Sequence, residues 1–133
     1  MTSRVYIPAT SALLVRLVAE GRLDGPFRAH AVTDELRSDW ADGDEESWEY
    51  AALMAAAAGS VALRSGGDAP RRCVIAADVP SVVPVAGDDP TLVEVTADVP
   101  WKNVAAAHVD LVDDADEDDD LAWFATQEIA HLT

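Results

Sequence analysis

The segment that most restricts how this chain can fold is an alanine-rich stretch at residues 44–64. Gly43 interrupts the chain before it, and a Ser-Gly-Gly run at residues 65–67 ends it. The acidic residues 44–46 place negative charge in the first turn, where the helix dipole favours it, so we predict one long helix. Its many small side chains let a helix lie close to a sheet. We therefore expect both faces of this helix to be partly buried.

Short apolar and β-branched segments on both sides of this helix predict the strands of that sheet. Two of them end in the same Asp-Val-Pro sequence, and proline cannot donate a hydrogen bond to a strand ladder. The predicted strands cover residues 4–8, 27–32, 74–80, 93–100 and 105–112.

Capping residues and apolar stripes predict three further helices, at residues 11–20, 34–40 and 120–132. Thr10 or Ser11 can cap the first of them, and Gly21 ends it in the usual C-terminal place. Thr33 or Asp34 can cap the second. The third follows a strongly acidic run.

Together these elements predict an α+β fold in the order β-α-β-α-α-β-β-β-α, with one mixed sheet of about five strands covered by helices. A length of 133 residues suits a single domain, so we assign residues 1–133 to one domain. Within it, residues 110–120 are predicted to be an acidic linker that leads to the C-terminal helix at 120–132.

The charge of the chain argues against several classes of partner. It has 25 acidic and nine basic residues, which give a formal charge of −16. Nucleic acids and anionic bilayers are bound mainly through Lys and Arg, so we expect neither nucleic acid nor membrane as a partner. No apolar run approaches the ~20 residues of a membrane span, and the single Cys73 leaves no pair for an internal disulfide. We expect a cytoplasmic protein with no cofactor.

The negative charge is concentrated between Asp110 and Asp120. A calcium loop of the EF-hand type starting at Asp114 needs glycine at its sixth position and glutamate at its twelfth. This chain has Asp119 and Ala125 there. We therefore predict a solvated linker that caps the last helix, and no metal site. The alternative is that the acidic face occupies a partner's nucleic-acid groove or steers a basic partner.

Several titratable residues have two interpretations. Asp78 and Asp98 could pair for acid–base chemistry, but we favour the interpretation that each caps a turn before Val-Pro. Cys73 is predicted to be a packed small residue, although the adjacent Arg71 and Arg72 could lower the pKa of its thiol. The three histidines lack the spacing of metal ligands.

Three runs carry a resemblance to known sequences: RVYIPAT at residues 4–10, GDEESWEYAAL at 43–53 and RRCVIAADVP at 71–80. Together with Ala31-Val32-Thr33, they look like an uncharacterised family of small actinobacterial proteins. The similarity spans residues 4–111, and that family has no known activity.

The order of elements carries a second, more distant resemblance. A strand, a helix ending in EGRL at residues 20–23 and the run FRAHAVT at 27–33 are similar to small domains of the ADP-ribosyltransferase-like fold. In such domains the first strand often supplies a His or Arg that holds the nicotinamide nucleotide, whereas residues 5–8 here read Val-Tyr-Ile-Pro. The resemblance implies that His30 and Thr33 contact a ligand, and that Tyr50 stands in for a stacking tyrosine.

The function we favour from the sequence is a non-catalytic binding or regulatory module, with a protein partner or a small nucleotide ligand. Its pocket is predicted between the first strand and helix and the segment from His30 to Tyr50. One alternative is a nucleotide- or ADP-ribosyl-handling enzyme, in which Tyr6 helps to position the ligand and Glu49 or Glu94 acts as acid or base. The other alternative is an acidic mimic or assembly partner of a basic protein.

Overall fold

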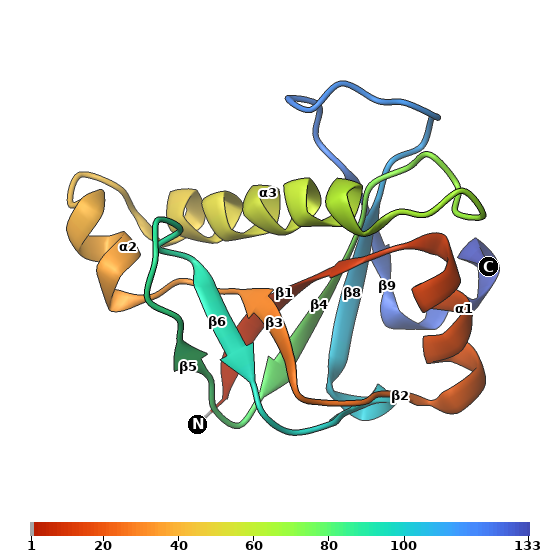
Figure 1. Cartoon of the computed structure of the whole chain (residues 1–133), viewed down its shortest axis with the longest axis horizontal. Helices are drawn as coiled ribbons and strands as arrows, with labels where there is room; N and C mark the ends of the chain where they lie inside the picture. Colours follow the sequence, from red (N-terminus) through yellow and green to blue (C-terminus); the bar gives the residue numbers. More distant parts are fainter. Residues whose placement is uncertain (1) are drawn as a thin grey trace.

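An antiparallel sheet of seven strands forms the centre of the protein, in the order β5-β6-β3-β1-β4-β8-β9 (Figure 1). The structure is a computed structural model that describes residues 2–133. The strands of this sheet are β1 (Ser3–Ala9), β3 (Phe27–His30), β4 (Cys73–Val79), β5 (Val83–Pro84), β6 (Leu92–Val95), β8 (Val104–Val109) and β9 (Ala122–Ala125). A separate two-stranded ribbon pairs β2 (Arg22–Leu23) with β7 (Val99–Pro100).

Helices lie on both sides of the sheet, so the protein has three layers. The long helix α3 (Glu45–Leu63) lies along one face (Figure 1). The opposite face is covered by α1 (Ser11–Glu20), the β2–β7 ribbon and the C-terminal 3₁₀ helix η2 (Thr126–Leu132). The remaining helical elements are α2 (Asp34–Asp39) and the 3₁₀ turn η1 (Trp101–Asn103).

The expected α+β class is confirmed, but two details of the predicted sheet are wrong. The sheet is wholly antiparallel rather than mixed, and it has seven strands rather than about five. The additional strands, β5 and β9, are short and lie at its two edges. The predicted strand at residues 93–100 is also two strands, because the chain leaves the main sheet after Val95 and pairs with β2 at Val99.

The predicted helix starts are confirmed by their caps. The side chains of Thr10, Thr33 and Asp44 accept hydrogen bonds from the backbone N–H groups of Leu13, Leu36 and Ser47, respectively. Gly21 ends α1 in the left-handed conformation, with φ of 72°. These helices begin and end where local hydrogen bonds satisfy the terminal backbone groups.

The predicted helix at residues 120–132 is wrong. Residues 122–125 instead form β9, which pairs with β8 so that Trp123 lies opposite His108. Without β9, the outer edge of β8 would expose unpaired backbone groups. The seven residues that remain form only the 3₁₀ helix η2, and so short a segment has little helical stability of its own.

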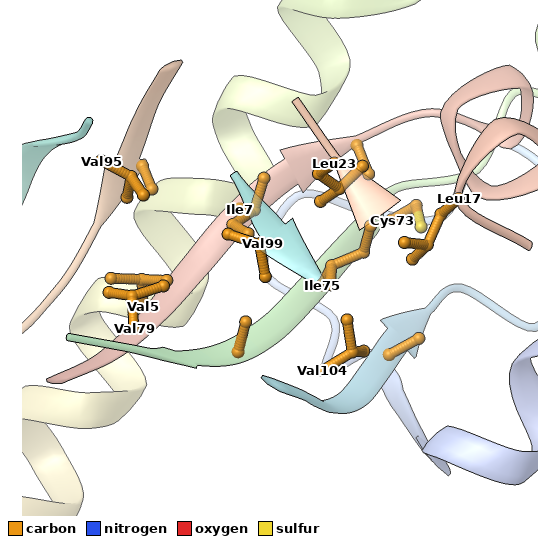
Figure 2. Packing of buried hydrophobic residues seen from close by; sticks show 14 of the residues in the cluster. Val5, Ile7, Leu17, Leu23, Cys73, Ile75, Val79, Val95, Val99 and Val104 are labelled. Atoms are coloured by element: carbon orange, nitrogen blue, oxygen red, sulfur yellow. The ribbon is translucent and has the colours of Figure 1, made fainter. Parts of the chain in front are cut away.

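The core is divided between the two faces of the sheet. On the α1 face, alternate residues of β1 and β4 pack with side chains from α1, the ribbon and η2 (Figure 2). This larger cluster includes Val5, Ile7, Leu17, Leu23, Ile75, Val99 and Ile129. On the α3 face the packed residues are small, mainly Ala52, Ala56, Ala57 and Ala76 with Val74. Small side chains on both surfaces let α3 lie close to the sheet, as predicted.

A buried serine joins α3 to the two central strands. The Ser60 hydroxyl donates a hydrogen bond to the carbonyl of Ala9 at 2.7 Å and accepts one from the N–H of Cys73 at 2.9 Å. Ala9 and Cys73 are opposite each other in the β1–β4 ladder. Ser60 therefore holds the C-terminal half of α3 against the sheet at one defined position.

Three of the larger side chains of α3 point toward solvent, although Leu53 packs against the small-residue cluster. Tyr50, Val61 and Leu63 are about half exposed or more, whereas Ala52, Ala56 and Ala57 are buried.

None of the helices within residues 2–133 has the combination of length and apolar character that crossing a membrane requires.

Candidate ligand-binding cavity

A cavity of about 450 Å³ lies where strands β1 and β3 separate. Within the described chain these strands pair at only one position, Tyr6 opposite His30. The residues that come next on β1, Ile7 and Pro8, line the cavity together with Phe27 and Arg28 of β3. Side chains of α1, the β2 segment and the C-terminal half of α3 complete its wall.

The interior of the cavity is mostly apolar. Its apolar lining comes from β1, α1, β2, β3 and α3, through Ile7, Pro8, Leu13, Leu23, Phe27 and Leu63. Gly59 is part of this wall, and a Cβ atom at its position would lie 3.0 Å from Cγ of Pro8. The glycine therefore lets α3 approach β1 closely beside the cavity.

Charged side chains lie around this apolar interior, and arginine is the most frequent of them. Arg16 pairs with Glu20 at 3.3 Å and Arg22 pairs with Asp24 at 2.7 Å. The third, Arg28, has no acidic side chain within 4.0 Å in residues 2–133. In a chain with a formal charge of −16, this unpaired guanidinium is suited to an anionic group.

His30 lines the same cavity and its ring has a defined tautomer. The Thr91 hydroxyl donates its proton to Asp89 at 2.7 Å, so its oxygen accepts the 2.8 Å hydrogen bond from Nδ1 of His30. Nδ1 therefore carries the ring proton, and Nε2 is an acceptor on the side of Gly59. Burial lowers the pKa of His30, and the nearby Asp89 carboxylate opposes this shift in part.

Tyr6 and Glu49 lie together on the face of the sheet that α3 covers. Burial, followed by the neighbouring Glu49 carboxylate, raises the pKa of the Tyr6 hydroxyl. The Tyr6 ring is 6.4 Å from the ring of His108, centroid to centroid. One Glu49 oxygen, Oε2, is buried without a hydrogen-bond partner in the described chain. Tyr6 is packed under α3 and Glu49 is a residue of that helix, whereas His30, opposite Tyr6, contributes to the cavity.

The other residues that the sequence suggested lie elsewhere. Thr33 caps α2, and its hydroxyl also donates to the carbonyl of Pro90. Tyr50 is 47% exposed on α3, and its hydroxyl donates to Asp120 at 2.7 Å. Glu94 is on β6, opposite Arg28 of β3. The structure thus places Tyr6 beside Glu49 and opposite His30, and places Tyr50 at the acidic loop.

The interpretation of Cys73 as a packed residue agrees with its burial, whereas the interpretation that Asp78 and Asp98 each cap a turn before Val-Pro is wrong, because both carboxylates contact residues far away in the sequence. Asp78 pairs with Arg4 at 2.8 Å, while Asp98 accepts from the N–H of Gly25 at 2.8 Å, so the two carboxylates serve different segments. Cys73 is buried, and this burial raises the pKa of its thiol to about 12. The adjacent Arg72 does not lower that pKa, because its guanidinium is bound to Asp110.

The acidic run at residues 110–120 is a loop whose residues, apart from Asp110 and Ala115, are exposed, and it leads to strand β9 instead of capping a C-terminal helix. Asp110 and Arg72 form a buried pair with 2% and 4% of their side-chain surface exposed. Arg72 also donates to the carbonyls of Glu117 at 3.0 Å and Asp119 at 2.7 Å. In residues 2–133, no three His, Cys, Asp or Glu side chains are grouped as metal ligands.

Two functional candidates were missed in the sequence, Arg28 and Arg72. Arg28 sits in a weak predicted strand and has no local pattern that distinguishes it from any exposed strand residue. Arg72 was visible only as a neighbour of Cys73, because its partner is 38 residues away. The one sequence feature that could have pointed to these two arginines is the rarity of basic residues in a chain with 25 acidic residues.

The fold and the cavity define a small, strongly acidic α+β protein with an arginine-lined apolar pocket. The chain belongs to a family of unknown function, DUF6912, whose model matches residues 3–133. This confirms the resemblance to an uncharacterised family and extends it to the C-terminus. No curated protein and no solved structure matches the chain, so the resemblance to the ADP-ribosyltransferase-like fold gains no support.

Proposed function

We propose that the protein is a non-catalytic binding module and that its cavity takes a small organic anion with an apolar body. The observation that carries this proposal is the combination of an apolar interior with the unpaired guanidinium of Arg28. A volume of about 450 Å³ is within the range of small-molecule pockets. Arginine recognises carboxylate and phosphate groups through two parallel hydrogen bonds.

His30 supplies a second polar contact to the proposed ligand. Because Nδ1 donates to Thr91, the free Nε2 accepts a hydrogen bond from a ligand hydroxyl or N–H group. The anion at Arg28 and the donor at His30 then fix the orientation of the apolar body between them. Such a small number of well-placed polar groups in an apolar pocket is typical of ligand sites.

A non-catalytic role is favoured over a nucleotide-handling enzyme by the carboxylates around the cavity. Those that line it, Glu20 and Asp24, are each engaged by an arginine. The candidate acids or bases Glu49 and Glu94 do not line the cavity: Glu49 is on α3 with its Oε2 buried, and Glu94 is on β6, opposite Arg28 in the ladder. A general acid or base must come within hydrogen-bond reach of the reacting group.

The proposal is tested by a thermal-shift panel of naphthalene-2-carboxylate, octanoate, phenyl phosphate, AMP, NAD and ADP-ribose. We expect an apolar carboxylate or phosphate to raise the Tm by several degrees, and Arg28→Gln to remove most of that rise. The matched control is Arg64→Gln, which removes an arginine outside the cavity and leaves the rise intact. No shift with any compound contradicts the proposal, and turnover of NAD or ADP-ribose favours the enzyme instead.

A further inference from the structure

A second hollow, separate from the cavity, lies between α3 and the acidic loop 110–120. Its volume is about 670 Å³, and the loop stands beside the C-terminal half of α3 (Figure 1). Met54, Ala58 and Val61 form its apolar side at the spacing of one helix face. Val61 is 46% exposed although it is apolar. We call this hollow the α3–loop groove.

The opposite wall of the α3–loop groove is acidic. It includes the side chains of Asp114, Glu117 and Asp118. Within residues 2–133 none of these carboxylates lies within 4.0 Å of a cationic group. Their charges are therefore not balanced by ion pairs within the described chain. Two arginines also line the groove, but Arg72 is paired with Asp110, so Arg64 is the cation that remains against the three acidic side chains within residues 2–133.

The acidic wall is held in position by contacts that do not use these three carboxylates. Arg72 donates hydrogen bonds to the backbone carbonyls of Glu117 and Asp119. Tyr50, at the edge of the groove, donates to Asp120 at 2.7 Å. The wall is thus preorganised, so little ordering of the loop is needed when a partner binds.

We propose that the α3–loop groove docks a basic amphipathic segment of a partner protein. The apolar face of such a segment packs on Met54, Ala58 and Val61, and its Lys or Arg side chains face the acidic wall. A second copy of this chain fits less well, because it also has a charge of −16 and contains a single lysine. Nucleic acid is disfavoured because its phosphates would face carboxylates.

The test is fluorescence anisotropy of the full-length protein with a labelled synthetic peptide, in which Leu and Lys are placed at the spacing of an amphipathic helix. A scrambled peptide of the same composition and a Leu-free lysine peptide are the controls. We expect the amphipathic peptide to bind at least about tenfold more tightly than either control. Glu117→Gln/Asp118→Asn should weaken its binding by about tenfold.

Two further variants separate docking from simple charge attraction. Val61→Asp adds negative charge but disrupts the apolar side, so docking predicts weaker binding and charge attraction predicts tighter binding. Asp39→Asn/Asp42→Asn removes the same charge as the wall variant near α2, at the other end of α3 (Figure 1). It should weaken binding by less than about twofold, since salt screens distant charges. Circular dichroism checks that each variant is folded.

The proposal is overturned by any of three results. These are equal binding of the amphipathic and scrambled peptides, equal loss in the wall and α2 variants, or tighter binding by Val61→Asp. Self-association of the protein that masks the groove and is broken by Val61→Asp would assign the surface to a second copy instead. None of these results bears on the cavity, because Arg28 and His30 are not part of the groove.

Discussion

Arg72 and Asp110 form a buried, two-pronged ion pair next to the register pair Cys73 and Val109 of strands β4 and β8. Nε and Nη2 of Arg72 donate to the two carboxylate oxygens of Asp110, each at 2.9 Å. The backbone N–H of Arg72 donates to the same carboxylate at 2.8 Å. Asp110 is therefore the point at which the acidic loop is attached to the sheet.

Removing one member of this pair should strongly destabilise the fold. Asp110→Ala leaves a buried guanidinium without its carboxylate, and we expect a loss of about 3–5 kcal/mol in the free energy of unfolding. Urea denaturation measures this loss. The control is Asp113→Ala, which breaks the neighbouring exposed pair with Arg71 and should cost no more than about 1 kcal/mol. Similar losses in both variants would contradict a special role for the buried pair.

The hydroxyl of Ser60 is predicted to contribute more to the free energy of unfolding than the hydroxyl of an exposed serine. Ser60→Ala leaves the carbonyl of Ala9 and the N–H of Cys73 without their buried partner. We expect the free energy of unfolding to fall by about 1–3 kcal/mol. Ser65→Ala, at an exposed turn, is the matched control and should change it by less than about 0.5 kcal/mol. If both substitutions are equally mild, Ser60 does not join α3 to the sheet as described.

Gly25 is predicted to tolerate no side chain. A Cβ atom there would lie 2.5 Å from the carbonyl oxygen of Ala97, a backbone atom that cannot move aside easily. Gly25→Ala should therefore destabilise the fold by about 1–3 kcal/mol in urea denaturation. At Gly66 a Cβ atom meets nothing within 4 Å, so Gly66→Ala serves as the control with little effect. A neutral Gly25→Ala would show that the turn and the segment at Ala97 are not packed together.

The stability of the protein should fall on mild acidification. Burial lowers the pKa of both His30 and His108, so the unfolded chain, whose histidines titrate near about 6.5, takes up protons first. The free energy of unfolding is then fully present above that pH and decreases as pH falls through the lower folded pKa values. Urea denaturation at a series of pH values measures this slope. The His30→Gln/His108→Gln variant should have a flatter profile, and an unchanged slope would contradict the assignment.

The parts of the fold that depend on nearby residues were predictable from the sequence. The three α-helices were expected from local signals: the caps Thr10 and Thr33 lie within three residues of the groups they satisfy, and the acidic residues 44–46 mark the start of α3. The edge strand β9 was missed because its formation depends on the free edge of β8. Without β8 beside them, the apolar residues after residue 120 are as compatible with an α-helix as with a strand.

The candidate cavity was predicted only in part. A pocket between the first strand, the first helix and His30 matches the cavity that the structure contains. Tyr50, the other end of the proposed segment, lies at the acidic loop instead, because it is on the exposed side of α3. Arg28 was missed because the separation of β1 and β3 after one residue pair leaves no mark in the sequence.

The most direct test of the central claim is an NMR titration of the ¹⁵N-labelled protein with naphthalene-2-carboxylate, following the backbone amides and the Nε–H signals of the arginines. Binding in the cavity predicts saturable shifts concentrated at Ile7, Phe27, Arg28, His30 and Gly59. Arg28→Gln should weaken the apparent affinity by about tenfold, as expected for loss of a charged contact worth about 1.5 kcal/mol, and Arg64→Gln should leave it unchanged. Shifts spread over the surface, or centred on the acidic loop, would contradict a ligand site in this cavity.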